Sequence, residues 1–175
     1  MFSDYEPAYC DGQPLKERSI DFQEIYLPDI EQATGGIFSL AQLLKSGRIL
    51  DIGCGSGALA NALRKKGYRG KIIGVDAFGP YQGDTAYREY EELIFGDVRN
   101  EMTLNKIAKH EYDNAICVGL PPQACEFVLN NPGRFKLKKR GLLTVASDDI
   151  HSTPQQFSRY DGQYSAVQNI FLFRK

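Results

Sequence analysis

Short apolar runs alternate with amphipathic segments along most of the chain. Runs such as RILDI and KIIGVD are almost continuously apolar, which is typical of strands buried on both faces of a sheet. The segments between them repeat their apolar residues at helical spacing. We predict strands at Arg48–Ile52, Lys71–Asp76, Glu92–Gly96, Asp113–Gly119 and Gly141–Ser147, and helices at Ser56–Lys66, Tyr81–Glu91, Glu101–His110 and Pro121–Asn130.

Strands that alternate with helices in this way form a parallel sheet covered by helices on both faces. The alternation stops after residue 147, where a short polar segment precedes QFSRYDG and the chain ends QYSAVQNIFLFRK. We predict an antiparallel hairpin there, with its turn at Asp161-Gly162.

The first part of the chain follows a different pattern. Residues 1–18 are polar without an apolar period, and Pro28 interrupts any single helix over residues 19–34. After Gly35-Gly36, IFSLAQLLKS predicts a short amphipathic helix. We interpret residues 1–175 as one domain, with an N-terminal arm over residues 1–36 and a core over residues 37–175.

Composition excludes several classes of protein. With 21 Lys and Arg against 22 Asp and Glu, the net charge of −1 argues against bulk attraction to nucleic acid or acidic membranes. No apolar run is long enough to cross a membrane, and because the first residues lack a basic start, an apolar stretch and a small-residue cleavage site, we expect no signal peptide. The 4 cysteines have no metal-binding spacing. We expect a cytoplasmic protein with reduced thiols and without a membrane partner.

The segment RILDIGCGSGALANAL places Gly53, Gly55 and Gly57 between a predicted strand and a predicted helix. Glycines at such a turn let the backbone approach a ligand closely. Two interpretations of the ligand are open at this point, a dinucleotide and a cofactor without phosphate groups. The segment fits the dinucleotide fingerprint G-x-G-x-x-A, with Asp76 at the end of the next strand as the ribose acid. However, Asp51 beside the loop would repel a pyrophosphate.

The chain resembles the class I S-adenosylmethionine-dependent methyltransferases over about residues 37–175, in LDIGCGSG, IIGVDAF, FGDV, YDNAICVG and RGLLTV. The resemblance implies an α/β fold with a doubly wound, mostly parallel, seven-stranded Rossmann-like sheet that ends in an antiparallel hairpin. It also implies S-adenosylmethionine as the cofactor. That molecule carries an ammonium and a sulfonium and no phosphate, so the acid at Asp51 suits it better than it suits a dinucleotide.

The family's motifs imply which residues bind the cofactor. Three acids, Asp51, Asp76 and Asp97, would accept hydrogen bonds from the methionine amino group, the ribose hydroxyls and the adenine amino group, in that order. The other implied contacts are backbone approach at Gly53, Gly55, Gly57 and Gly119, and borders of the adenine at Ala77, Phe78 and Val98.

Catalytic chemistry is less clearly marked. His151 follows the fifth predicted strand at the edge expected for the active site, which makes it a candidate general base, although it also fits an exposed loop histidine. Asp148 and Asp149 resemble metal ligands of the family's catechol-type branch. Because no acid follows the fourth strand, we predict no metal.

Three hypotheses remain for the function. The first is methyl transfer to a small molecule, and the second is an RNA or protein methyltransferase that needs a partner. The third is an inactive methyltransferase-like scaffold or regulatory subunit. The basic clusters Arg64-Lys65-Lys66 and Lys136–Arg140 fall at the edge opposite the cofactor, which disfavours nucleic acid. Because the chain is short for the family, we expect an open acceptor site, or one completed by a second copy or a partner subunit.

Overall fold

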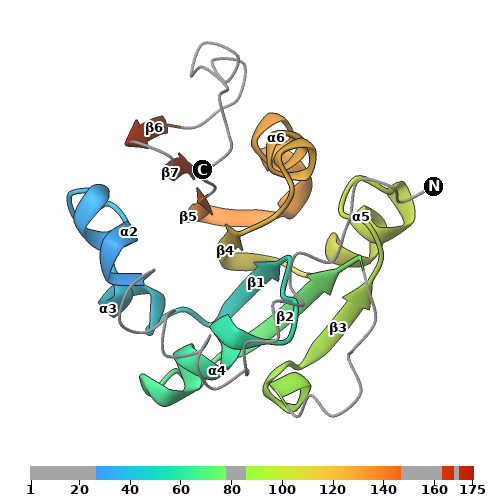
Figure 1. Ribbon diagram of the computed structural model, residues 1–175, viewed down its shortest axis with the longest axis horizontal. Helices are drawn as coiled ribbons and strands as arrows, with labels where there is room; N and C mark the ends of the chain where they lie inside the picture. The colour runs from blue at the N-terminus through green and yellow to red at the C-terminus, as the bar shows by residue number, and fades with distance from the viewer. Residues whose placement is uncertain (1–26, 78–85, 147–162, 168–169) are drawn as a thin grey trace.

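A seven-stranded sheet runs through the protein in the order β3-β2-β1-β4-β5-β7-β6 (Figure 1). The structure is a computed structural model that describes residues 27–77, 86–146, 163–167 and 170–175. Most of the central strands are nearly uninterrupted apolar runs, as expected where helices cover both faces. The strands are β1 (Arg48–Ile52), β2 (Lys71–Asp76), β3 (Glu92–Phe95), β4 (Tyr112–Val118), β5 (Leu137–Ala146), β6 (Gln163–Val167) and β7 (Ile170–Arg174).

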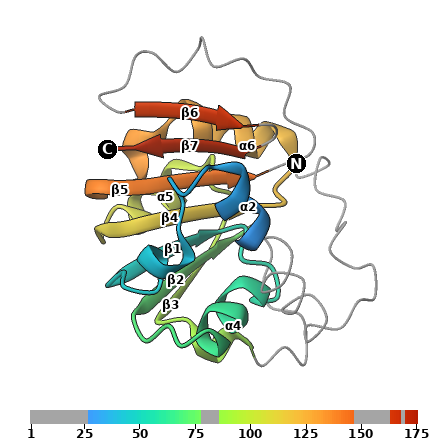
Figure 2. The ribbon, with the colours of Figure 1, turned by 90° about the vertical axis from the view of Figure 1, so that its left-hand side faces the viewer.

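Strands β1 to β5 are parallel, whereas β7 runs antiparallel to both β5 and β6 (Figure 2). In this register Asp51 of β1 lies beside Gly74 of β2 and Ile116 of β4. The carboxyl ends of the parallel strands therefore meet at one edge of the sheet. The predicted fold class, a mostly parallel α/β sheet with a terminal antiparallel pair, is confirmed.

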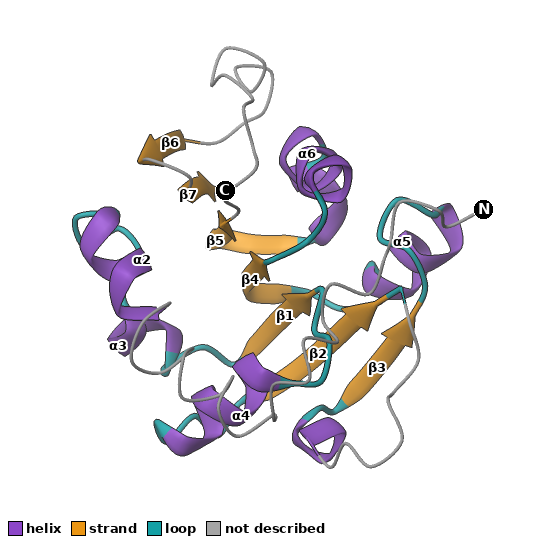
Figure 3. Cartoon of the chain, in the orientation of Figure 1, coloured by secondary structure: helices purple, strands orange, loops and turns teal. Residues whose placement is uncertain are grey.

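Helices cover both faces of the sheet, with α2, α3 and α4 on one face and α5 and α6 on the other (Figure 3). No helix in the described ranges is long and apolar enough to span a membrane. The α-helices are α2 (Leu27–Ala33), α3 (Leu40–Leu43), α4 (Ala58–Lys65), α5 (Glu101–Ile107) and α6 (Pro122–Asn130), and the 3-10 helices are η3 (Ala86–Glu89) and η4 (Pro132–Phe135).

Each face of the sheet buries its own apolar layer, because side chains alternate along a strand. In β1, Ile49 packs with α2, α3 and α4, whereas Leu50 packs with α5 and α6. Leu27 and Ile30 of α2 are only 0% and 2% exposed and belong to the first layer. Pro28 lies in the first turn of α2, where its missing N–H leaves no intrahelical bond unmade. The packed body therefore begins before the predicted boundary at residue 37, and Pro28 lies at the start of α2; the part of the prediction that concerns residues 19–26 lies outside the described residues.

One local prediction was wrong, and a second is described only in part. In the hairpin, Val167 of β6 pairs with Ile170 of β7, so both paired strands come after Asp161-Gly162 instead of lying on either side of it. Both strands come from the final run QYSAVQNIFLFRK, which the sequence pattern predicts as one strand, and Asp161-Gly162 lies outside the described residues. The crossover predicted as helical over Tyr81–Glu91 is described only from residue 86 onward, where it holds the 3-10 helix η3.

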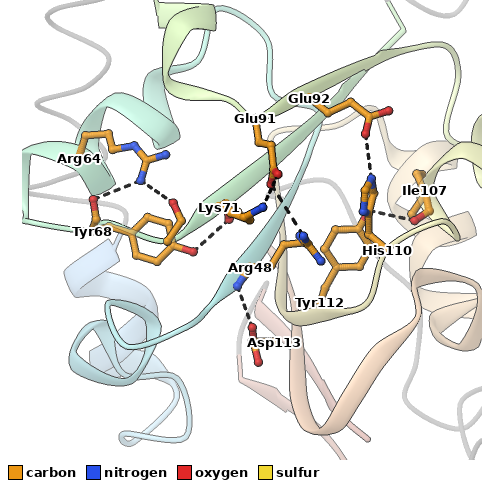
Figure 4. A network of polar contacts seen from close by, with 11 residues as sticks. Arg48, Arg64, Tyr68, Lys71, Glu91, Glu92, Ile107, His110, Tyr112 and Asp113 are labelled. Carbon is orange, nitrogen blue, oxygen red and sulfur yellow. Dashed lines mark hydrogen bonds and ion pairs between the residues drawn. The ribbon is translucent and has the colours of Figure 1, made fainter.

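Charged side chains form pairs at the amino ends of the strands (Figure 4). The backbone N–H of Arg48 donates to Asp113 Oδ2 at 2.7 Å, and Arg48 Nη2 lies 3.9 Å from Glu91 Oε2. His110 Nε2 lies 2.8 Å from Glu92 Oε2. These contacts join β1 to β4 and to the start of β3, so the amino edge of the sheet carries a structural polar network.

Candidate cofactor-binding site

A glycine-rich loop joins β1 to α4 at the carboxyl edge of the sheet. Its three glycines all have positive φ, at 78° for Gly53, 49° for Gly55 and 88° for Gly57. Residues with a Cβ rarely adopt such values, which explains why glycine stands at each position. The N–H groups of Gly53 and Cys54 both donate to the carbonyl of Val75, at 2.8 and 3.0 Å. The loop is thus tied to the end of β2.

The first two glycines serve different purposes. A Cβ added at Gly53 would lie 2.5 Å from Leu120 Cδ2, so this glycine lets the loop pack against the segment after β4. A Cβ added at Gly55 would meet nothing within 4 Å. The backbone at Gly55 therefore borders open space, where a ligand could approach it.

Ser56 lies between the second and third glycines of the loop. Its side chain is only 2% exposed, and its Oγ has no hydrogen-bond partner in the described part of the chain. Buried hydroxyl groups are normally hydrogen-bonded, so this atom lacks the partner it would be expected to have. A polar ligand group beside the loop would supply that partner.

Asp76, the last residue of β2, reaches the glycine loop directly. The N–H of Gly55 donates to Asp76 Oδ2 at 2.8 Å. The two residues are 21 positions apart in the sequence, and both were predicted to contact the cofactor. The fold therefore brings these predicted site residues together.

Asp51, near the end of β1, is a buried acid. It is 4% exposed, and its Oδ2 accepts a hydrogen bond from the hydroxyl of Tyr90 at 2.6 Å. Burial raises the pKa of Asp51 from 3.8 to about 7; the hydrogen bond from Tyr90 opposes this rise, and the negative charge of Asp76 adds to it. No Lys or Arg of the described residues forms an ion pair with Asp51.

The sequence analysis did not identify Tyr90, which precedes β3 and contacts Asp51 from 39 positions away. A Cβ added at Gly74 would lie 2.8 Å from Tyr90 Cε1 and 2.9 Å from Cys54 Sγ, so Gly74 makes room for both side chains. Burial and the nearby acids Asp51 and Asp76 raise the pKa of the Cys54 thiol well above its usual value. Cys54 therefore stays protonated and is not a nucleophile.

Asp97, which follows β3 and is 9% exposed, is held by Arg99. Arg99 Nε lies 3.0 and 3.1 Å from the two carboxylate oxygens of Asp97, and Arg99 Nη2 lies 2.7 Å from Oδ2. Burial alone would raise the pKa of Asp97, but the hydrogen bonds from Arg99 bring it below its usual value. Asp97 therefore remains ionised. Its neighbour Val98 is 4% exposed and packs in the core layer beneath α5 and α6, which leaves little surface for the predicted adenine contact.

The remaining predicted residues are only partly described. Ala77 directly follows Asp76 and is half-buried, and Gly119 directly follows β4 with a φ of 74°. Phe78 and His151 lie outside the described residues, as do Asp148 and Asp149, so their roles stay predictions. The described ranges contain no cluster of three or more side chains suited to hold a metal ion.

A cavity of about 340 Å³ opens far from the glycine loop. Its polar lining includes Lys138, Lys139, Arg140 and Arg174. These residues lie at the start of β5 and the end of β7, which meet at the amino edge of the sheet. The basic cluster near residue 138 is thus separate from the predicted cofactor site.

A family model described as a methyltransferase domain matches residues 30–160, which is well over half of the chain. The chain belongs to this methyltransferase family. The match spans β1 to β5 and includes the glycine loop together with Asp51, Asp76 and Asp97. No curated protein sequence matches this methyltransferase domain significantly.

Solved structures share the methyltransferase domain's fold at low sequence identity. MycE methyltransferase from the mycinamycin biosynthetic pathway, in complex with Mg and SAH, has a TM-score of 0.56 at 18% identity, covering 93% of this chain and 49% of that chain. An O-methyltransferase family protein from Burkholderia thailandensis has a TM-score of 0.52 at 14% identity, covering 95% of this chain and 60% of that chain. A hypothetical protein from Thermus thermophilus has a TM-score of 0.52 at 14% identity, covering 96% of this chain and 89% of that chain. The domain spans about half the length of the MycE chain.

Proposed function

We propose that this methyltransferase domain transfers the methyl group of S-adenosylmethionine to a small-molecule acceptor. The observation that carries the proposal is a positive-φ glycine loop that lies between two acids. Asp51 is buried at the end of β1, and Asp76 accepts the N–H of Gly55. The open space at the Cβ position of Gly55 and the orphaned hydroxyl of Ser56 fit a polar ligand at this loop.

The same contacts disfavour a dinucleotide. A dinucleotide fingerprint needs backbone N–H groups of the loop aimed at a pyrophosphate. In this protein the Gly55 N–H is already donated to Asp76, and Asp51 adds a second acid beneath the loop. Two carboxyl groups at one loop favour a cationic ligand over an anionic one.

S-adenosylmethionine, when bound, supplies a methyl group on a sulfonium that is already activated for displacement. The residues of this chain then have the tasks of binding and orientation, which can account for much of the rate gain in such a transfer. Asp51 would hold the ammonium group, Asp76 the ribose hydroxyls, and the backbone at Gly55 would border the methionine portion. A general base is needed only if the acceptor keeps its proton at working pH, and His151 remains the candidate for that role.

A small-molecule acceptor is favoured by two observations. MycE, which shares the fold, belongs to the biosynthetic pathway of mycinamycin. The basic side chains Lys138 to Arg140 line a cavity at the amino edge of the sheet, away from the glycine loop, so they do not offer a nucleic-acid track to the site. We propose that the acceptor site is open, or is completed by residues 1–36 or by a second subunit.

Calorimetric titration tests the proposal. We expect S-adenosylmethionine and S-adenosylhomocysteine to bind in the micromolar range, and Asp76→Asn to weaken binding at least tenfold, or about 1.4 kcal/mol. Asp113→Asn is the matched control, since Asp113 also accepts a backbone N–H, from Arg48 at 2.7 Å, but at the opposite edge of the sheet. A folded protein that binds neither ligand would contradict the proposal, and binding of NADH instead would favour the dinucleotide hypothesis.

A second experiment tests the acceptor. Release of S-adenosylhomocysteine would be measured with a panel of hydroxyl- and amine-bearing small molecules, and in parallel with total RNA and with protein extract. Turnover with a member of the small-molecule panel supports the proposal. Turnover only with RNA or protein would replace it with the macromolecular alternative, and binding without turnover in any arm would favour the scaffold.

A further inference from the structure

The side chain of Tyr90 reaches across strand β2 to contact Asp51. Tyr90 lies just before β3, Asp51 lies in β1, and β2 runs between these strands. The ring crosses β2 at Gly74, where any Cβ would come within 2.8 Å of Tyr90 Cε1. Both ends of the contact are buried, with Tyr90 9% and Asp51 4% exposed. A hydrogen bond of 2.6 Å in such surroundings fixes the orientation of the carboxyl group.

The hydrogen bond from Tyr90 makes the two carboxylate oxygens of Asp51 inequivalent. Tyr90 donates to Oδ2, and no hydrogen bond from the described residues reaches Oδ1. We propose that Tyr90 is a positioning residue for the cofactor: its hydroxyl fixes Oδ2 of Asp51, so that Oδ1 accepts the ammonium group of the methionine portion. This inference rests on the proposed function.

The charge state of Asp51 makes this role measurable. The titratable groups that act on the pKa of Asp51 are Tyr90 and Asp76, and Asp51 in turn raises the pKa of the nearby thiols of Cys54 and Cys117. Burial raises the pKa of Asp51 to about 7, and the negative charge of Asp76 adds to this rise, while the hydroxyl of Tyr90 lowers it. Because only the ionised carboxyl attracts an ammonium group, ligand affinity should fall as the pH drops through 7. Without the Tyr90 hydroxyl the pKa of Asp51 would be higher, so the same loss of affinity should begin at a higher pH.

The experiment measures the dissociation constant of S-adenosylhomocysteine by calorimetry between about pH 6 and about pH 8, for the unmodified protein, Tyr90→Phe and Tyr112→Phe. The unmodified protein should bind about tenfold more tightly at the upper pH, because a group with a pKa near 7 is mostly ionised there and mostly protonated at the lower one. Tyr90→Phe should weaken binding and shift the profile to higher pH.

Tyr112→Phe is the matched control for the loss of a buried tyrosine hydroxyl. Tyr112 is 0% exposed, and its hydroxyl donates to the carbonyl of Ile107 at 2.9 Å, remote from the glycine loop. This variant should keep the pH profile of the unmodified protein even where it loses stability. Titration of the ligand's own amino group is common to all three proteins and cancels in the comparison.

5′-Methylthioadenosine provides a second arm, because it keeps the adenosine and the sulfur but lacks the amino acid. Its affinity should not change with Tyr90→Phe or across this pH range. Equal losses for both ligands would give Tyr90 a general structural role and overturn the inference. So would a flat profile for S-adenosylhomocysteine in the unmodified protein, which needs no variant. If neither ligand binds any of the proteins, the proposed function itself fails.

Discussion

Replacing Asp51 by asparagine tests how the fold accommodates a carboxyl group that is only 4% exposed. Burial raises its pKa from 3.8 to about 7. Between these values the unfolded chain has lost the proton and the folded protein still holds it, so folding takes up a proton and stability falls as the pH rises. Each pH unit costs about 1.4 kcal/mol, and an interval of roughly three units gives about 4 kcal/mol. The stability that depends on a protonated Asp51 is fully present below about pH 4 and is lost by about pH 7.

The free energy of unfolding would be measured by urea titration with far-ultraviolet circular dichroism, since the chain has 0 Trp for fluorescence. The free energy of unfolding of Asp51→Asn, compared with that of the unmodified protein, should rise by about 4 kcal/mol between about pH 4 and about pH 8. Asp113→Asn is a control of opposite sign. Although burial works against it, hydrogen bonds from Arg48 and Lys138 lower the pKa of Asp113, so its stabilising contribution is lost as the pH falls. An Asp51→Asn difference that stays constant over this range would refute the reasoning.

Two further predictions concern the loop and the acid after β3. Gly53→Ala should destabilise the fold by about 2–4 kcal/mol, because residue 53 has a positive φ and its added Cβ would clash with Leu120. Gly55→Ala should cost only about 1 kcal/mol of stability but should weaken the binding of S-adenosylhomocysteine. Urea unfolding measures the stabilities and calorimetry the binding, and equal stability losses in the two variants would contradict this difference. Arg99→Ala should cost about 1–3 kcal/mol at neutral pH, because buried Asp97 would lose its charged partner and keep only the backbone N–H of residue 99. The loss should shrink as the pH falls through the lowered pKa of Asp97, and a pH-independent loss in urea unfolding would count against this prediction.

The sheet and its loop could be predicted from sequence because their signals are local. Apolar runs located β1 and β2 at their observed bounds, and glycines between a strand and a helix marked the loop. Asp51 and Asp76 could be proposed as site residues because each lies at or near the end of a strand beside that loop and matches a motif of the family that the sequence resembles. Parallel strands then bring their carboxyl ends together without further information.

The contacts that the sequence did not reveal depend on tertiary structure. Tyr90 meets Asp51 across 39 positions, and its place depends on the absence of a side chain at Gly74 in a third element. The hydrogen bonds from Arg99 to Asp97 span only 2 positions, but an arginine so close to an acid has no motif of its own. The hairpin was misplaced because Asp-Gly is a strong turn signal, whereas the two strands that pair, Gln163–Val167 and Ile170–Arg174, both come after it.

The acids at the carboxyl edge of the sheet differ in what neutralises them. Asp97, the acid expected near the neutral adenine ring, has its charge balanced by Arg99 at 2.7 Å. Asp51, the acid expected near the methionine ammonium, accepts its hydrogen bond from the uncharged hydroxyl of Tyr90 and has no cationic partner among the described residues. An uncompensated buried carboxyl costs stability, so it is explained best by a ligand that brings the missing positive charge. S-adenosylmethionine carries positive charge at its methionine end and none on its adenine ring, which is the distribution that this pair of acids fits.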